Sequence, residues 1–152
     1  MTVYLMCGLP GAGKSTYVKE NFSNIVILSK DDISYELGIY DSSTHGIKRI
    51  RTASEEKQIS DILNQRLIEC CENNLDCVID DINLTKSYRN WYLEKIKPYN
   101  PHVVMIYINT PSDICAERRK GEIPTGVVKA LKVIPPTSDE YDELISLNTI
   151  VD

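Results

Sequence analysis

The sequence lacks the cysteine pattern of a metal site or of a disulfide framework. A zinc site needs cysteine or histidine ligands in closely spaced pairs, and a disulfide framework needs an even number of cysteines. This chain has five cysteines, most of them inside apolar runs: Cys7, Cys70, Cys71, Cys77 and Cys115. We therefore expect reduced cysteines in the core, as in a cytoplasmic protein.

The sequence also lacks a long hydrophobic run and a charged-then-apolar leader. A transmembrane helix needs about 20 predominantly apolar residues, and a secretory signal needs an apolar core behind a basic start. Their absence predicts a cytoplasmic protein that does not contact a membrane.

An excess of positive charge is missing as well, because the net charge is −5 at pH 7. Broad binding to duplex nucleic acid draws its affinity from neutralised phosphates, so a protein of that kind is disfavoured. Two short basic clusters, Lys48–Arg51 and Glu117–Lys120, leave room for a local basic groove. No internal repeat or low-complexity tract interrupts the 152 residues, which suits one domain over residues 1–152.

A phosphate-binding motif follows the first apolar run of the chain. The stretch GLPGAGKST, Gly8–Thr16, satisfies the pattern G-x-x-x-x-G-K-[ST] without a gap. In this motif, backbone N–H groups and the helix start surround a phosphate, the lysine contacts the outer phosphates and the Ser/Thr hydroxyl ligates Mg²⁺. We therefore predict that ATP and Mg²⁺ bind here. The predicted nucleotide-binding residues of the loop are Gly8, Gly11, Ala12, Gly13, Lys14, Ser15 and Thr16, and Ser15 is also the predicted Mg²⁺ ligand.

Strand and helix patterns alternate along the chain, which indicates an α/β fold with a parallel sheet and helices on both faces. Short apolar runs predict strands over residues 2–7, 25–29, 77–81 and 102–108. Helical spacing and capping signals predict helices over residues 14–21, 52–72, from 85 to 97, after Pro111, and over 124–131. Residues 38–51 read as an irregular connection, either a functional or mobile loop or a tolerated surface excursion.

The third of these helices is predicted to begin at Thr85 and to stop at Pro98. Its large apolar side chains recur at helical spacing, so we expect one face to carry Tyr88, Trp91, Tyr92 and Ile96.

Acidic side chains follow two of the predicted strands. The carboxyl ends of parallel strands meet at one edge of a sheet, where ligands bind. Asp80 is predicted to hold Mg²⁺, directly or through water, with a helix or turn cap as the alternative. Asp31 is predicted to accept the proton of an attacking hydroxyl, while Asp32 caps the helix that follows. Which of these two aspartates is the base stays open.

A cationic cluster near the end of a later predicted helix suits a short lid over the phosphates. Arg118, Arg119 and Lys120 precede Gly121. Arginine donates to phosphate oxygens in pairs, and a closing lid keeps competing water out. We predict that Arg118 contacts the nucleotide and stabilises the transition state. The alternative is a helix C-terminus that merely carries cations.

With these residues in place, the chain resembles the small P-loop kinases grouped with the phage-type polynucleotide 5′-hydroxyl kinases. The resemblance spans most of the chain and rests on five segments: GLPGAGKST, SKDD at 29–32, VIDDINL at 78–84, ERRK at 117–120 and IPTGVV at 123–128. It implies a P-loop NTPase core like that of adenylate kinase, with a short lid. The residues that it implies are Asp31 as general base, Asp81 and Asn83 as substrate-binding residues, and Arg118 in the lid.

Two positions depart from the pattern of these kinases. Ser34 stands where they carry an arginine that clamps the acceptor's phosphate, and Glu122 stands where they carry a second lid arginine. Arg119 and the cluster Lys48–Arg51 are the candidates to substitute.

The leading hypothesis is therefore an ATP-dependent kinase that transfers the γ-phosphate to the 5′-hydroxyl of a polynucleotide, single-stranded or with an exposed end. The negative net charge and the missing clamp arginine favour a second hypothesis, in which the acceptor is a nucleoside, a sugar or an amino-sugar nucleotide. A third hypothesis is a nucleotide-binding ATPase or switch without an acceptor, because a phosphate loop alone does not define the reaction.

Overall fold

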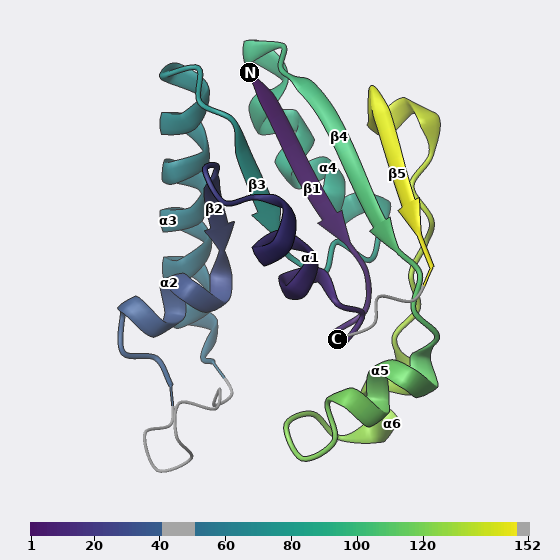
Figure 1. The fold of residues 1–152 in the computed structure, drawn as a ribbon. Helices are drawn as coiled ribbons and strands as arrows, with labels where there is room; N and C mark the ends of the chain where they lie inside the picture. Colours follow the sequence, from purple (N-terminus) through teal and green to yellow (C-terminus); the bar gives the residue numbers. More distant parts are fainter. Residues whose placement is uncertain (41–50, 149–152) are drawn as a thin grey trace.

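The structure, a computed structural model, describes residues 1–40 and 51–148. The predicted alternation of strands and helices is confirmed (Figure 1). The strands are β1 (Thr2–Cys7), β2 (Val26–Ser29), β3 (Cys77–Asp80), β4 (His102–Ile108) and β5 (Glu143–Leu147). The helices are α1 (Lys14–Asn21), α2 (Lys30–Glu36), α3 (Ala53–Glu72), α4 (Lys86–Ile96), α5 (Ser112–Arg118) and α6 (Thr125–Ala130), with 3₁₀ turns η2 (Lys97–Tyr99) and η3 (Ser138–Glu140). Most of the connection predicted over 38–51, including Lys48 and Arg49, lies outside the described residues.

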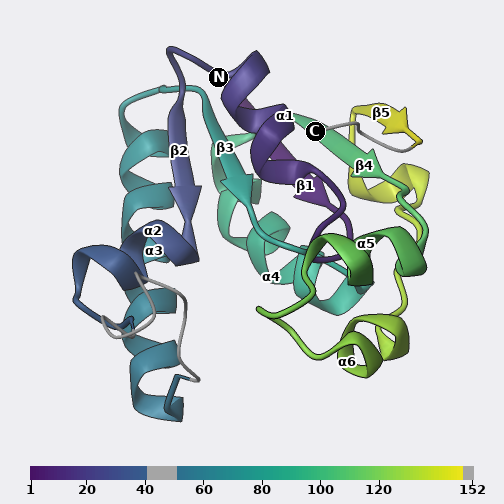
Figure 2. The same ribbon diagram turned by 60° about the horizontal axis from the view of Figure 1, so that its bottom comes forward.

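The sheet is parallel throughout and has the strand order β2-β3-β1-β4-β5. β1 lies at its centre, with Val3 opposite Cys77 of β3 on one side and Val103 of β4 on the other. The carboxyl ends of β1, β2 and β3 therefore meet at one edge, and Figure 2 turns this edge forward. The phosphate-loop motif follows β1 at that edge, so the sheet topology determines where the site forms.

Two hydrophobic clusters cover the two faces of the sheet because successive strand residues point to opposite sides. Leu5 of β1 packs in the cluster that α3 and α4 cover, whereas Met6 packs in the cluster that α1 and α5 cover. Figures 1 and 2 show α1 on one face and α3 and α4 on the other. Coverage of both faces explains why the strands are apolar runs rather than alternating patterns.

Helix α3 confirms the capping box predicted from the sequence. Thr52 accepts a hydrogen bond from the backbone N–H of Glu55, and the Glu55 carboxylate accepts one from the backbone N–H of Thr52. The buried side chains of α3 keep the predicted helical spacing: Ile59, Leu63, Leu67, Cys70 and Cys71.

Helix α4 begins after Thr85 as predicted, but only Tyr92 and Ile96 of its predicted face are buried. Tyr88 is 66% exposed and Trp91 is 40% exposed, with the Lys95 ammonium over the Trp91 ring. The buried residues are Arg89, Tyr92 and Ile96. A fully buried arginine occupies the inner position because Glu140, distant in sequence, supplies its counter-charge.

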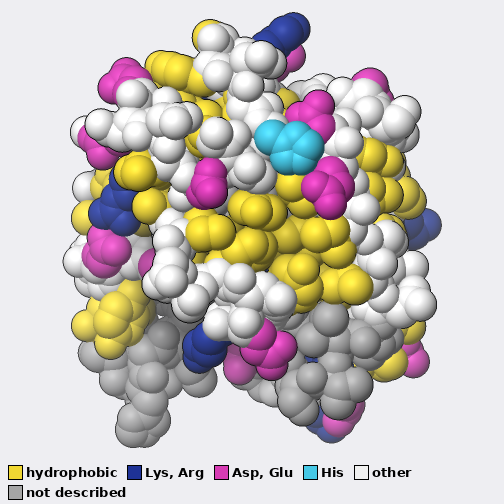
Figure 3. Space-filling model, turned by 45° about the horizontal axis from the view of Figure 1, so that its top comes forward, with side chains coloured by type: hydrophobic (Ala, Val, Ile, Leu, Met, Phe, Trp, Pro, Cys, Tyr) yellow, Lys and Arg dark blue, Asp and Glu magenta, His cyan; other side chains and the backbone are white. Residues whose placement is uncertain are grey.

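The strands begin at the top of the view in Figure 1, opposite the end that carries the phosphate loop, and Figure 3 brings this top forward. There His102, at the start of β4, lies 3.4 Å from the carboxylate of Glu143 and 3.9 Å from that of Asp142. The predicted site residues all follow the carboxyl ends of the strands instead. Over residues 1–40 and 51–148, none of the helices combines the length and the apolar composition that a membrane crossing requires.

Candidate nucleotide and phosphoryl-acceptor site

Lys14 is held inside the phosphate loop by the loop's own carbonyl groups. Helix α1 begins at this residue, directly after Gly13, whose φ of 105° lies in the left-handed region. The Lys14 side chain is only 8% exposed, and Nζ donates to the carbonyl oxygens of Gly8 (3.0 Å) and Leu9 (2.9 Å). Burial lowers the pKa of this ammonium to about 8. The loop thus presents a desolvated cation at the start of a helix, where an anion is stabilised.

Gly11 allows the loop and helix α5 to approach each other. Its φ is +85°, and a Cβ atom added there would lie 2.7 Å from the carbonyl oxygen of Cys115. An Arg118 Nη1 donates to the Gly11 carbonyl oxygen at 3.1 Å. Next to it, the carbonyl of Ala12 accepts a hydrogen bond from the Thr110 hydroxyl (2.8 Å). A side chain at position 11 would therefore force α5 away from the loop.

Ser15 and Asp80 lie together at the ends of α1 and β3. The Ser15 hydroxyl donates to Asp80 Oδ2 at 3.4 Å. Burial raises the pKa of the Asp80 carboxyl, Lys14 opposes this rise, and the negative charge of Asp31 adds to it. Ser29 of β2 lies opposite Asp80 of β3, and α2 with Asp31 begins directly after Ser29, so the two carboxylates lie at the same edge of the sheet.

This pair of oxygen donors fits a magnesium site. Mg²⁺ is held in such enzymes by one or two protein oxygens, with waters and substrate phosphates completing its shell. Ser15 and Asp80 supply that number beside the phosphate loop. Within the described parts of the chain, no group of three or more His, Cys, Asp or Glu side chains is placed to hold a metal ion.

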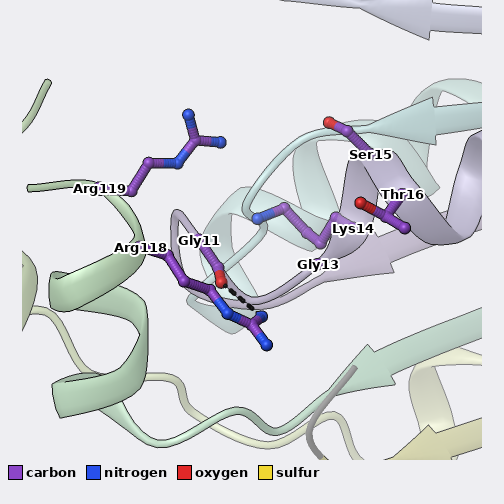
Figure 4. Close-up of a pocket in the computed structure, with 7 residues that line it drawn as sticks. All are labelled: Gly11, Gly13, Lys14, Ser15, Thr16, Arg118 and Arg119. Atoms are coloured by element: carbon purple, nitrogen blue, oxygen red, sulfur yellow. Dashed lines mark hydrogen bonds between the residues drawn. The ribbon is translucent and has the colours of Figure 1, made fainter. Parts of the chain in front are cut away.

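Two arginines from the end of α5 line the same pocket as the phosphate loop. The pocket measures about 230 Å³, and Figure 4 shows Arg118 and Arg119 on one side with Lys14, Ser15 and Thr16 on the other. Arg119 donates to Glu122 at 2.7 Å. Glu122 stands where the resembled kinases carry a second lid arginine, and in this chain it holds the neighbouring arginine instead.

Asp31 lies in the first turn of α2, which follows β2 at the same edge of the sheet. Arg51 donates to Asp31 Oδ1 at 3.0 Å and to Glu56 Oε1 at 3.1 Å, and its own side chain is 12% exposed. The predicted cap of α2 needs correction, because the N-cap residue is Ser29 and not Asp32. The Ser29 hydroxyl accepts from the Asp32 N–H at 3.3 Å, because α2 begins at Lys30 directly after β2 and Asp32 already lies in its first turn.

Asp81 is held by three neighbours. Its Oδ2 accepts from the Tyr92 hydroxyl at 2.8 Å and lies 3.7 Å from Lys30 Nζ, while Oδ1 accepts from the Ile82 N–H at 2.8 Å. Tyr92 is buried, and this burial raises the pKa of its phenol well above the usual range. Asp81 is therefore held as a hydrogen-bond acceptor between α2 and α4.

Asn83 lies inside the protein and not on the pocket surface. It is 1% exposed, its φ is 50°, and its amide donates to the Met6 carbonyl oxygen at 2.7 Å. Direct contact between Asn83 and an acceptor would require this loop to rearrange. In its present position Asn83 ties the loop after β3 to the central strand.

The contacts of three residues that shape the site were not predicted. Arg51 was named only as part of the basic cluster Lys48–Arg51, and Tyr92 only as one of several large side chains on a helix face. Arg89 carried no signal beyond a charged residue at an inner helical position, which could have marked it as a buried ion-pair partner.

The glycine loop between β1 and α1, with its buried lysine and the carboxylate at the tip of β3, gives the protein the fold and the phosphate loop of a P-loop NTPase. The chain belongs to the AAA domain family, whose model matches residues 3–122. This confirms the P-loop fold that the resemblance implied.

Solved structures with the same fold share little sequence with this chain. A presumed kinase from Chloroflexus aurantiacus is 15% identical, with a TM-score of 0.71, 97% of this chain covered and 84% of that one. A gluconokinase from Sinorhizobium meliloti is also 15% identical, with a TM-score of 0.63, 99% of this chain covered and 84% of that one.

A third similar structure is a chain of the Pnkp1/Rnl/Hen1 RNA repair complex, 17% identical with a TM-score of 0.69. The match covers 84% of this chain and 42% of that one, so this chain spans less than half of that protein.

The depressed pKa of Lys14 predicts that nucleotide binding depends on pH. Phosphates favour the charged ammonium, so the bound state holds the Lys14 proton more tightly than the free state, whose pKa is about 8. Affinity for ATP should be greatest below pH 8 and should fall as the pH rises above it, with proton uptake on binding at about pH 9.

Calorimetric titration in buffers of different ionisation enthalpy measures that uptake. Lys14→Arg, which stays protonated, is the control that should lose it. Unchanged wild-type affinity over this range would contradict the assignment.

Gly11→Ala should disturb both stability and nucleotide binding. The positive φ costs about 1–3 kcal/mol for a residue with a Cβ atom, and the added atom meets the backbone of Cys115. We expect thermal unfolding several degrees lower and weaker ATP binding. Gly126→Ala in α6 is a matched control, since nothing lies within 4 Å of its added Cβ atom. Equal effects of the two substitutions would show that the close approach at Gly11 is unimportant.

Proposed function

We propose that the protein is a Mg²⁺-dependent kinase that transfers the γ-phosphate of ATP to a hydroxyl group, with the 5′-hydroxyl of a polynucleotide as the favoured acceptor. One observation carries the proposal. A phosphate loop with a buried lysine adjoins a carboxylate suited to Mg²⁺, Asp80. Ser29 lies opposite Asp80 in the sheet and leads directly into the helical turn that carries a second carboxylate, Asp31. Donor phosphates and an attacking hydroxyl would thus meet between the tips of neighbouring strands.

Each residue has a role that its position supports. Lys14 binds the outer phosphates, Ser15 and Asp80 hold the metal, and Asp31 accepts the proton of the attacking hydroxyl. Arg118, at the pocket wall, donates to phosphate oxygens as negative charge redistributes. When bound, Mg²⁺ neutralises phosphate charge and orients the donor.

The acceptor side carries an exposed aromatic surface on the helix that holds Asp31. Tyr35 lies four residues after Asp31 on α2, hence on the same helical face. It is 61% exposed, and its ring stacks on that of Tyr40 with centroids 4.6 Å apart and planes inclined by 18°. Exposed aromatic rings bind bases of single-stranded nucleic acid by stacking. The exposed Tyr35–Tyr40 pair therefore favours an acceptor that carries a nucleobase beside the attacking hydroxyl.

A small polar acceptor is the second candidate, and the charge pairing around Asp31 favours it. Within the described part of the acceptor side, Lys30 and Arg51 are both in ion pairs with carboxylates, those of Asp81 and Asp31. These pairs reduce the positive charge offered to a phosphorylated acceptor. The similar solved structures include both a chain of an RNA repair complex and a gluconokinase, so the fold is compatible with either class.

Asp31→Asn should lower the turnover number by about 10²- to 10⁴-fold, because the amide cannot accept the hydroxyl proton. The dissociation constant for ATP should hardly change, since Asp31 lies on the acceptor side. Asp32→Asn, one residue along the same exposed turn, is the matched control and should keep most of the activity. If turnover instead depends on Asp32, the base has been misassigned.

The class of acceptor can be measured with radiolabelled ATP offered separately to a 5′-hydroxyl oligonucleotide, the same oligonucleotide with an abasic 5′ position, nucleosides and sugars. We expect the highest kcat/KM for the oligonucleotide that carries a terminal base. Tyr35→Leu should reduce that value by roughly 10-fold, within the 1–3 kcal/mol of a lost stacking contact, and Tyr35→Phe should restore it.

The abasic acceptor provides the internal control, because its kcat/KM should be the same for wild type and Tyr35→Leu. Label in sugars or free nucleosides alone would support the small-molecule candidate. Label released only as free phosphate would contradict a kinase.

A further inference from the structure

Arg89 forms an ion pair in the protein interior. Its side chain is 0% exposed and that of Glu140 is 1% exposed. Arg89 Nε donates to Glu140 Oε1 at 2.6 Å, and Nη2 donates to Oε2 at 3.4 Å. The pair joins helix α4 to the η3 turn near the C-terminal end of the described chain.

The same guanidinium also joins two segments of backbone. Arg89 Nη1 donates to the carbonyl oxygens of Asn83 and of Ile134, each at 2.9 Å. Ile134 is held a second time, because its N–H donates to the Leu84 carbonyl oxygen at 2.8 Å. The segment around Ile134 is therefore fastened to the loop after β3 through both of its backbone polar groups.

These two segments lead directly into the candidate site. Asp80 is the last residue of β3 and Asp81 is the first residue of the loop after it, and these are the carboxylates proposed to bind metal and acceptor. Ile134 follows the α5–α6 hairpin (112–130), which carries Arg118 and Arg119 into the pocket. The hydrogen bond from the Thr110 hydroxyl to the Ala12 carbonyl holds the end where the chain enters the hairpin. Arg89 holds the end where the chain leaves it, at Ile134.

A gain in folding stability does not explain why an ion pair is buried here. Removing two charges from water is costly, and buried ion pairs are often replaced by apolar residues of similar volume without loss of stability. A planar group with five donors can, however, bind a carboxylate and two carbonyls at once, which an apolar side chain cannot do.

We propose that Arg89 is a positioning residue. It fixes the end of the α5–α6 hairpin at Ile134 to the loop that follows Asp80. It thereby sets the separation between the hairpin arginines and the carboxylates across the pocket. The effect on catalysis rests on the proposed kinase function, whereas the mechanical link does not.

The test uses a double variant, Arg89→Met with Glu140→Leu, which removes both charges and keeps the volume apolar. We expect a folded protein whose kcat/KM for ATP is about 10- to 100-fold lower, because small misplacements of catalytic groups have effects of this size. We also expect faster trypsin cleavage after residues 118–120 in the absence of nucleotide. The matched control is Lys86→Gln with Asp139→Asn, since this exposed pair joins the same two elements at 2.7 Å. Its kinetics and cleavage should match wild type.

A folded double variant with wild-type kinetics and wild-type cleavage would overturn the proposal. If the double variant does not fold, Arg89→Lys decides. Lysine keeps the charge opposite Glu140 but cannot reach the carboxylate and both carbonyls together, so it should show the same two changes, and wild-type behaviour would refute the role. Absence of phosphoryl transfer in the wild-type protein would contradict the kinase function but not the role of Arg89. The trypsin measurement tests that role without nucleotide.

Discussion

The site depends on one buried cation. Lys14 sits at the start of α1 with its ammonium against the carbonyl groups of Gly8 and Leu9. Burying that charge is unfavourable, as its lowered pKa records, and bound phosphates would relieve the cost by supplying a counter-charge. The left-handed glycines, the close approach of α5 and the carboxylate of Asp80 are arranged around this group.

A parallel sheet turns this local arrangement into a site with two sides. β1 delivers the phosphate loop, β3 delivers Asp80 and Asp81, and β2 leads into α2 with Asp31. Adjacent strands bring these groups together although they are distant in sequence. The α5–α6 hairpin closes the remaining side with Arg118 and Arg119, and hydrogen bonds at both of its ends connect it to the loops that it faces. The phosphate loop, the carboxylates at the strand ends and the hairpin arginines thus have separate structural supports.

The sequence was sufficient for features whose physical cause is local. The glycine pattern of the phosphate loop, the capping box of Thr52 with Glu55 and the apolar runs of the buried strands each depend on neighbours within a few residues. Contacts between distant segments could not be inferred in the same way. The inner position of Arg89 depends on Glu140, and the Asp31 contact depends on Arg51 at the start of another helix. The interior position of Asn83 depends on a carbonyl of the central strand.

The central claim is that nucleotide phosphates and an acceptor carboxylate face each other across the loop of Lys14. A crystal structure with a non-hydrolysable ATP analogue and Mg²⁺ tests it most directly. The account predicts the outer phosphates on Lys14, the metal between Ser15 and Asp80, and the terminal phosphate directed toward Asp31. A nucleotide bound elsewhere, or a terminal phosphate directed away from Asp31, would contradict it.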